Sequence, residues 1–383
     1  MKTLMALLAS AAVLAPALPQ EPPAAKPLPK PGMDPTAAPP WWLTRPDEIR
    51  AFLESLKGVQ VEEIGRTAGG RPIVAAAWGE REMLPGRTST SLASAIAGGD
   101  PSAFYGKGDR KRQVILFAGG AHGTEFDGTV AALHYLNILV TGKDLLGRDH
   151  PKVAEEGRKH RFIVIPLLNV DGRVRALDHV TWINCNAEYF SMVTQGLKKD
   201  GTLLEWPTSK LTYPLAVQDF KVLGTYFNDA GVNLVYDTPF GGDCQPETTA
   251  LLRYCRREMP DLVILSHSDN GSLVQEPSSY IPAHYRQRSD QIGAVVGMRC
   301  AREGFAKTRI PQSPHSYAGE QYYQSDGVYH ASGALPIVVE FPCGWQSVPP
   351  THRDILDIGL AVLDEISIFG NRYRFRPREP KRK

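Results

Sequence analysis

The pair His122 and Glu125, in the segment FAGGAHGTEFDG, has residue types and a spacing that suit metal binding. Imidazole nitrogen and carboxylate oxygen are both ligands that zinc accepts. The same spacing also arises by chance in a chain of this length, so an ordinary turn is the competing interpretation. None of the other histidines is followed by glutamate at this spacing. The choice between a metal site and an ordinary turn therefore depends on other polar residues.

Two further polar residues stand at the ends of apolar runs. His267 follows the run Leu262–Leu265, and Glu340 ends the run Pro336–Val339. A carboxylate at the end of a buried strand costs several kcal/mol unless it is paired or used. Two imidazoles, one carboxylate ligand and a second carboxylate are the set required by a zinc site with an open position and a general base.

The positions of these residues depend on four continuous apolar runs. Such runs are typical of strands buried on both faces, as in a parallel sheet covered by helices. The segments 128–142 and 245–259 between them have the pattern of helices. We therefore expect one α/β domain with a mixed, largely parallel central sheet flanked by helices on both faces. The four runs are Val114–Ala118, Phe162–Leu168, Leu262–Leu265 and Pro336–Val339.

If these strands are parallel, the polar residues that follow them gather at one edge of the sheet. That is the carboxyl edge, where open α/β sheets bind their ligands. Gly119 and Gly120 allow a sharp turn after the first run, and Gly123 is expected to leave room for metal or substrate. The pattern therefore favours a metal site over an ordinary turn.

The N-terminal part of the domain is predicted to hold a helix and a hairpin. Residues 44–58 have helical periodicity, and Thr44 or Asp47 is a candidate cap. Residues 61–79 are predicted to form two strands joined at a Gly-Gly turn.

The ends of the chain differ in composition from its middle. Residues 1–17 have the positive start, apolar stretch and small-residue cleavage site of an export signal, so we expect a periplasmic or extracellular protein. Residues 18–40 are a proline-rich linker or part of a removed pro-segment. The catalytic domain is expected over residues 41–370, followed by a basic tail, 371–383, that is either solvated or docks to an anionic surface.

Charge and cysteine content exclude several classes of function. Lys plus Arg is 43 and Asp plus Glu is 41, for a net charge of +2, which gives no electrostatic case for a nucleic-acid partner. No segment is expected to span a bilayer, because the apolar stretch of the export signal is shorter than the roughly 20 residues that spanning requires. The 5 cysteines permit one or two disulfides after export, and they form no CxxC pair. The oligomeric state is left open.

Over residues 42–370 the chain resembles the zinc carboxypeptidase family. The motifs that carry the resemblance are EIGRTAGGRPI, GGAHGTE, LLNVDGR, CQPETTALL, LVILSHS and LPIVVEFP, in the family's order and spacing. The resemblance implies one zinc ion bound by His122, Glu125 and His267, with Glu340 as the general base. A tyrosine upstream of that glutamate usually helps to bind substrate. Tyr317 has the best spacing for it, with Tyr322 and Tyr323 close behind, and a core or rim tyrosine is the alternative.

The chain departs from the family where substrate is recognised. The resemblance implies an Asn-Arg pair that binds the substrate's terminal carboxylate, and this chain has Val235 and Tyr236 there. Neither side chain replaces the charge of a bidentate arginine. Asn233 stands where the family has an aspartate that orients a ligand histidine, and its amide oxygen can still accept that hydrogen bond.

A second family arginine, which stabilises the oxyanion, is expected near residues 181–186. No basic residue occurs there. Arg173 and Arg175 are the candidate substitutes for substrate binding, and solvated loop arginines are the alternative interpretation.

Three functions remain open at this stage. The first is a zinc-dependent peptidase of carboxypeptidase type that acts on peptide or amide substrates. The second is a zinc-dependent amidase, N-acyl hydrolase or cell-wall peptide hydrolase that does not read a free C-terminus. The third is a non-catalytic binding protein on the same fold. A serine or cysteine nucleophile is disfavoured, because the chain has no Gly-x-Ser-x-Gly elbow and no cysteine with a local signature of activation.

Overall fold

The computed structural model describes most of the predicted catalytic domain. The described residues are 38–82, 92–105, 110–176, 182, 185–205, 214–237, 243–269, 280–305, 322–344 and 351–376. The proposed export signal, nearly all of the proline-rich segment, Tyr317 and most of the basic tail lie outside them.

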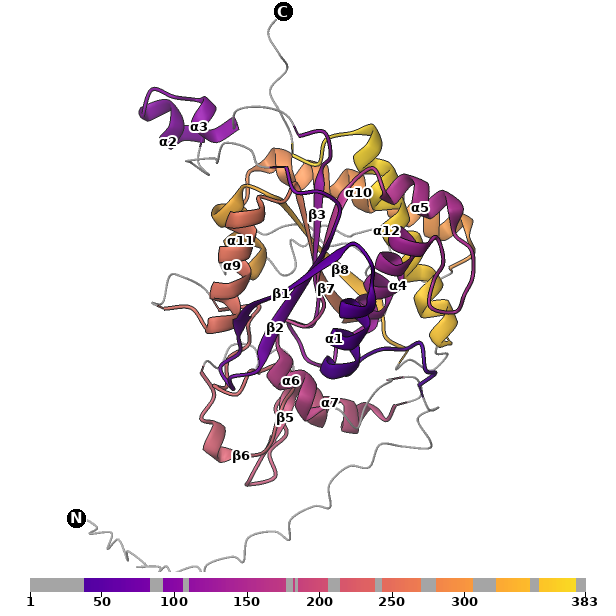
Figure 1. Cartoon of the computed structure of the whole chain (residues 1–383). Coiled ribbons are helices and arrows are strands. Elements are labelled where there is room, and N and C mark those ends of the chain that lie inside the picture. The colour runs from indigo at the N-terminus through magenta and orange to yellow at the C-terminus, as the bar shows by residue number, and fades with distance from the viewer. Residues whose placement is uncertain are drawn as a thin grey trace, which may run out of the picture.

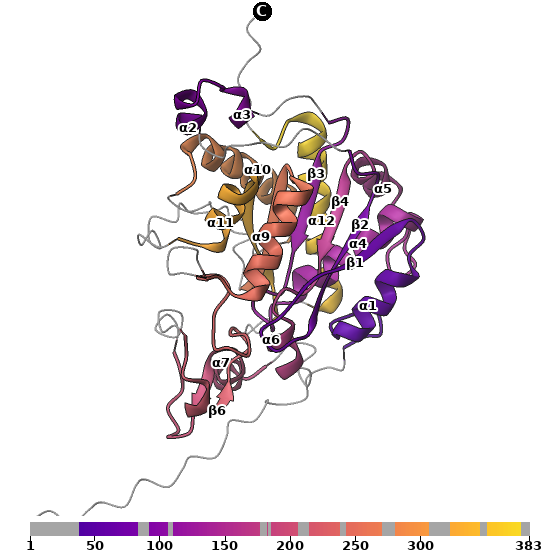
Figure 2. The same cartoon turned by 60° about the vertical axis from the view of Figure 1, so that its left-hand side comes forward.

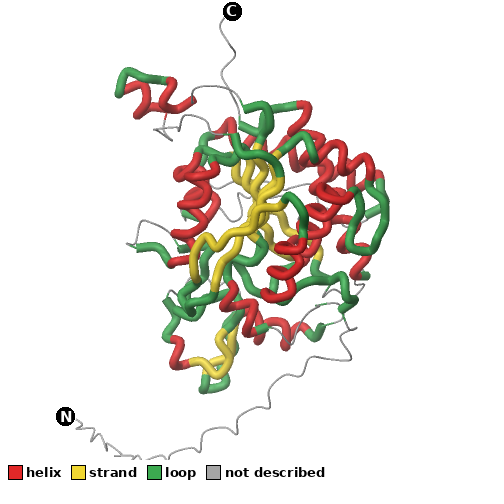
Figure 3. Tube along the Cα trace, in the orientation of Figure 1, coloured by secondary structure: helices red, strands yellow, loops and turns green. Residues whose placement is uncertain are grey.

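A mixed sheet of six strands runs through the middle of the domain, with helices on both sides (Figures 1 and 3). Its strand order is β1-β2-β4-β3-β7-β8. The pairs β4–β3, β3–β7 and β7–β8 are parallel, whereas β1–β2 and β2–β4 are antiparallel. The predicted fold class is confirmed. The strands are β1 Val59–Arg66, β2 Pro72–Trp78, β3 Val114–Ala118, β4 Arg161–Ile165, β7 Leu262–Asp269 and β8 Leu335–Pro342.

The continuous apolar runs form the centre of this sheet. Every residue of β3 and of β4 is buried, as expected of strands covered on both faces. The predicted second run extended to Leu168, but β4 ends at Ile165. The next residues leave the sheet to bond the turn after β3, where Leu168 N donates to Gly119 O and Asn169 N donates to Gly120 O.

Helices cover the two faces of the sheet unequally. Figures 1 and 2 show α9 and α11 on one side and α4, α5 and α12 on the other. α10 packs against α12 and against the edge strand β8. These helices are α4 Asp127–Thr141, α5 Pro151–Gly157, α9 Pro246–Glu258, α10 Ala283–Arg302, α11 Gln324–Ser332 and α12 His352–Arg372.

Smaller elements complete the described chain. Below the main sheet in Figure 1, α6 and α7 lie beside a small two-stranded sheet of β5 and β6. The bounds are α1 Pro46–Ser55, α2 Leu92–Ala97, α3 Ser102–Tyr105, α6 Val170–Arg175, α7 Ala187–Gln195, β5 Gly196–Lys198, the 3-10 helix η1 Val217–Asp219 and β6 Phe220–Leu223.

The predicted N-terminal hairpin is confirmed, but the predicted helix cap is wrong. α1 begins at Pro46 with Arg45 in the capping position and no side-chain cap. Asp47 lies inside the first turn, because the fixed φ of proline already sets the start of the helix.

All 5 cysteines are described, and each is a free thiol, so the disulfides that the cysteine count permits are not formed. Cys255 and Cys300 are buried in helices α9 and α10, and burial raises the pKa of each thiol to about 12. Among the described helices, none is both long enough and apolar enough to cross a membrane.

Candidate metal centre

The chain turns sharply after β3 and brings two predicted ligands to the edge of the sheet. Gly120 has a φ of +63°, which favours glycine, and the loop then carries His122 and Glu125 before α4 begins. Gly123 serves a different purpose from the one expected. A Cβ atom there would lie 2.2 Å from Gly172 C and 2.3 Å from Arg173 N. The glycine therefore makes room for the backbone of α6, not for metal or substrate.

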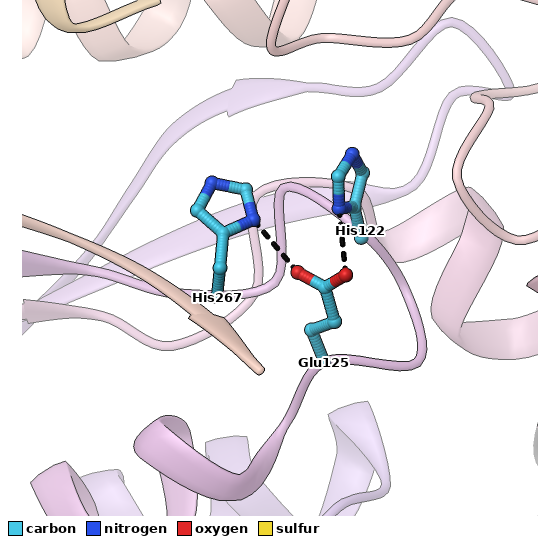
Figure 4. Close-up of side chains that lie close together, drawn as sticks. All are labelled: His122, Glu125 and His267. Carbon is cyan, nitrogen blue, oxygen red and sulfur yellow. Dashed lines mark hydrogen bonds and ion pairs between the residues drawn. The ribbon is translucent and has the colours of Figure 1, made fainter. Parts of the chain in front are cut away.

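His122, Glu125 and His267 converge, as predicted, although His267 lies inside β7 and not after it. Their ligand atoms all lie within 4.8 Å of one another. His122 Nδ1 is 2.9 Å from Glu125 Oε1, and His267 Nδ1 is 2.7 Å from Glu125 Oε2. Figure 4 shows the two rings facing the two carboxylate oxygens. All three side chains are buried.

The orientation of His122 suits a metal ligand. Its Nε2 lies 3.1 Å from Asn233 Oδ1, which also accepts a hydrogen bond from Val235 N. Its other ring nitrogen, Nδ1, is buried and faces Glu125 Oε1, so this nitrogen and the carboxylate can share one cation. Two imidazole nitrogens and a carboxylate are ligands that a zinc ion accepts. The contact of Asn233 with His122 is of the kind that orients a metal-binding histidine from outside.

Electrostatics keep Glu125 ready to bind a cation. Burial alone would raise the pKa of this carboxyl group, but the adjacent His122 and His267 outweigh it and lower the pKa well below its usual range. The group therefore stays ionised, which metal binding requires.

Glu340 lies beside this cluster because β7 and β8 are parallel neighbours. The register pairs His267 with Glu340 across the two strands, so both side chains leave the sheet on the same face. The pKa of Glu340 is raised to about 8, mainly by burial, with His267 opposing and Glu125 and Asp269 adding to the shift. A pKa near neutrality suits a group that takes up and releases a proton.

The two predicted substrate-binding arginines have other partners. Arg173 is buried, donates to Gly123 O and Ala176 O, and stacks over the ring of Phe126 at 4.6 Å. Burial lowers the pKa of its guanidinium to about 9.

Arg175 pairs with Asp229 and donates to Phe227 O and Gly224 O. Both arginines thus hold loops around the site together. Tyr317 lies outside the described residues.

Of three further side chains near the ligands, Tyr226 and Asp127 carried no sequence signal, whereas Tyr236 was noted for its place in the substrate-recognition motif. Tyr226 stacks on His122, and Tyr236 lies near enough to Glu125 and Glu340 for their charges to raise its pKa, after burial and Tyr323. Asp127 is fully buried at the start of α4, and burial raises its pKa to about 7. Their roles depend on contacts between distant parts of the chain.

A buried His-Glu-His cluster at the carboxyl edge of a mixed sheet, with a carboxylate beside it, has the residue types of a zinc hydrolase site. The family model "Zinc carboxypeptidase" matches residues 49–201, which include His122 and Glu125. Over these residues the chain is similar to the zinc carboxypeptidase family, and this match together with the fold supports a zinc metallopeptidase. No curated protein matches the chain.

Solved structures with the same fold have low sequence identity to this chain. A metallo-carboxypeptidase from Burkholderia cenocepacia is 16% identical, with 85% of this chain and 68% of that chain covered and a TM-score of 0.52. Bovine thrombin-activatable fibrinolysis inhibitor, solved with tick carboxypeptidase inhibitor, is 13% identical, with 87% and 99% covered and a TM-score of 0.53. At these identities the likeness establishes the fold.

Proposed function

We propose that the protein hydrolyses peptide bonds with one zinc ion held by His122, Glu125 and His267, and with Glu340 as the general base. The observation that carries this proposal is the pairing of His267 with Glu340 on neighbouring parallel strands. This pairing supports the proposal because strand register alone brings the Glu340 carboxylate next to the candidate ligands.

The division of labour follows from the residue types. A bound zinc ion would polarise the scissile carbonyl and lower the pKa of an attacking water from about 15.7 toward 7. Glu340 accepts the proton of that water at its carboxylate and delivers it to the leaving amine. Glu125 and the two histidines contribute by holding the ion with one position open.

Glu340→Gln tests the role of the base, because it keeps the size of the side chain and removes its proton-accepting oxygen. We expect kcat on a peptide substrate to fall by about 10²–10⁴-fold, with one zinc per chain retained by elemental analysis. Glu54→Gln, an exposed glutamate on α1, is the matched control and should keep full activity. A fully active Glu340→Gln enzyme would refute the proposed role. Activity that disappears on chelation and returns with zinc would exclude the non-catalytic binding protein.

A second candidate, hydrolysis of amides whose substrate lacks a free terminal carboxylate, is favoured by Tyr236. The groups whose charges shift the pKa values of Tyr236 and Glu340 are Tyr323, His267 and carboxylates, and no described arginine or lysine is among them. Arg175 is neutralised by Asp229. A carboxylate would gain little from these surroundings.

One peptide with a free or an amidated C-terminus separates the two candidates by product mass. Loss of one C-terminal residue from the free acid alone supports carboxypeptidase action. Equal cleavage of both forms supports the second candidate. Under that outcome, Tyr236→Arg is expected to introduce a preference for the free acid.

We also propose that the protein is exported, on the strength of residues 1–17. Cell-wall peptides are then within reach as substrates. Fractionation of the expressing cells, with the mass of the mature protein, tests this proposal.

A further inference from the structure

Tyr226 touches both ligands of the His122–Glu125 loop. Its ring stacks on the His122 imidazole, with centroids 3.9 Å apart and planes at 16°. Its hydroxyl is hydrogen-bonded to Glu125. The side chain is buried, with 9% of its surface exposed.

Backbone hydrogen bonds hold Tyr226 in this place. Tyr226 N donates to Thr194 O at 3.1 Å, which fixes the residue against the end of α7. The preceding residue, Thr225, accepts from Gly123 N at 2.9 Å, and its hydroxyl bonds to Thr124 at 3.1 Å. The segment that carries Tyr226 is thus attached directly to the loop that carries the ligands.

Tyr226 and Asn233 support His122 in complementary ways. Asn233 fixes the ring nitrogen that faces away from Glu125, as described above. Tyr226 packs on the face of the ring and restricts its rotation about the Cβ–Cγ bond. The tyrosine also holds the carboxylate of Glu125, which has lone pairs for a metal ion and a hydrogen bond together.

We propose that Tyr226 is a positioning residue of the metal centre, whose ring orients His122 and whose hydroxyl orients the carboxylate of Glu125. The inference rests on the proposed function, in which these residues bind zinc. Outer partners of metal ligands typically change metal affinity by about 10–100-fold when they are removed.

Tyr226→Phe tests the hydroxyl alone, because it keeps the ring on His122, whereas Tyr226→Leu removes both contacts. Zinc dissociation constants are measured by competition with a fluorescent chelator. We expect a loss of affinity of about 10–100-fold for Tyr226→Phe and a larger loss for Tyr226→Leu. Tyr135→Phe is the matched control. It removes a buried hydroxyl bonded to Ser367 in the interface of α4 and α12, and zinc affinity should stay within about threefold of the wild type.

A spectroscopic measurement separates positioning from a general effect on packing. With Co²⁺ in place of zinc, the visible absorption bands report ligand geometry. They should change in Tyr226→Phe and remain as in the wild type in Tyr135→Phe. If Tyr226→Phe does not fold, Thr225→Val tests the same attachment, and we expect it to weaken zinc binding severalfold.

The outcomes distinguish this inference from the proposed function. A wild-type protein that binds zinc, together with a Tyr226→Phe variant of equal zinc affinity and an unchanged Co²⁺ spectrum, overturns the role of Tyr226 alone. A wild-type protein that binds no zinc overturns the metal centre and this inference with it.

Discussion

Substitution of Gly123 by alanine separates two explanations for a glycine between two metal ligands. The sequence pattern suggests that glycine leaves room for metal or substrate. The structure instead places the backbone of α6 against it, with Gly172 C 2.2 Å and Arg173 N 2.3 Å from where a Cβ would lie. The two explanations predict different results for Gly123→Ala.

The expected magnitude follows from this overlap. Non-bonded carbon atoms rest at about 3.5–4.0 Å, so a Cβ at 2.2 Å requires a shift of more than about 1 Å in one of two backbones. Both are anchored, because Gly123 N donates to Thr225 O and Arg173 N donates to Asn169 O. We expect a loss of about 3 kcal/mol or more in the free energy of unfolding, at the upper end of overpacking costs. Zinc affinity should fall more than about tenfold, because the shift separates His122 from Glu125.

Urea unfolding of the metal-free protein, followed by tryptophan fluorescence, measures the change in stability. Gly327→Ala in α11 is the control, because its Cβ would meet only ordinary contacts, the nearest at 3.5 Å from Leu252 Cδ2. That variant should gain up to about 1 kcal/mol from helix propensity. If Gly123→Ala keeps wild-type stability and loses activity alone, the glycine serves the ligand space and our explanation is refuted.

Two further predictions concern the neighbours of the ligands. Asn233→Leu removes the acceptor at His122 Nε2 and should weaken zinc binding by about 10–100-fold. Asn233→Asp keeps an acceptor there and should bind zinc as tightly as the wild type. Equal zinc affinities of Asn233→Leu and the wild type in a chelator competition would contradict this prediction. Glu340 has its folded-state pKa raised to about 8, so the folded metal-free protein holds this proton more tightly than the unfolded chain. The resulting stability is present below the unfolded pKa of about 4.3 and is lost as the pH rises through 8. Metal-free Glu340→Gln should therefore melt above the wild type at pH values over about 8, with a difference that shrinks toward about pH 5, and a constant difference across this range would argue against it.

The sheet and the candidate metal ligands could be predicted from the sequence, because strands that are buried on both faces can be arranged in few ways. The continuous apolar residues of β3 can satisfy their backbone groups and exclude water only inside a covered sheet. Polar residues at the ends of such strands then have to meet at the carboxyl edge, as His122 and His267 do. Glu340 was found for the same reason, since strand register alone sets it beside His267.

The surroundings of the ligands could not be predicted in this way. Tyr226 stands in a loop without periodicity, and only the hydrogen bonds between Thr225 and the ligand loop bring it to His122. Arg173 illustrates a second limit of sequence position. A basic residue close in sequence to the site suggested substrate binding, but its guanidinium is used by backbone carbonyls such as Gly123 O.

The same reasoning explains how substrate recognition can change while the metal centre is kept. The turn that begins at Asn233 is held by backbone bonds, from Tyr236 N to Asn233 O and from Gln324 N to Val235 O. The side chains of Val235 and Tyr236 take no part in these bonds, so they can vary without moving Asn233 away from His122. Tyr236→Arg should therefore alter the preference for substrate without moving Asn233 away from His122.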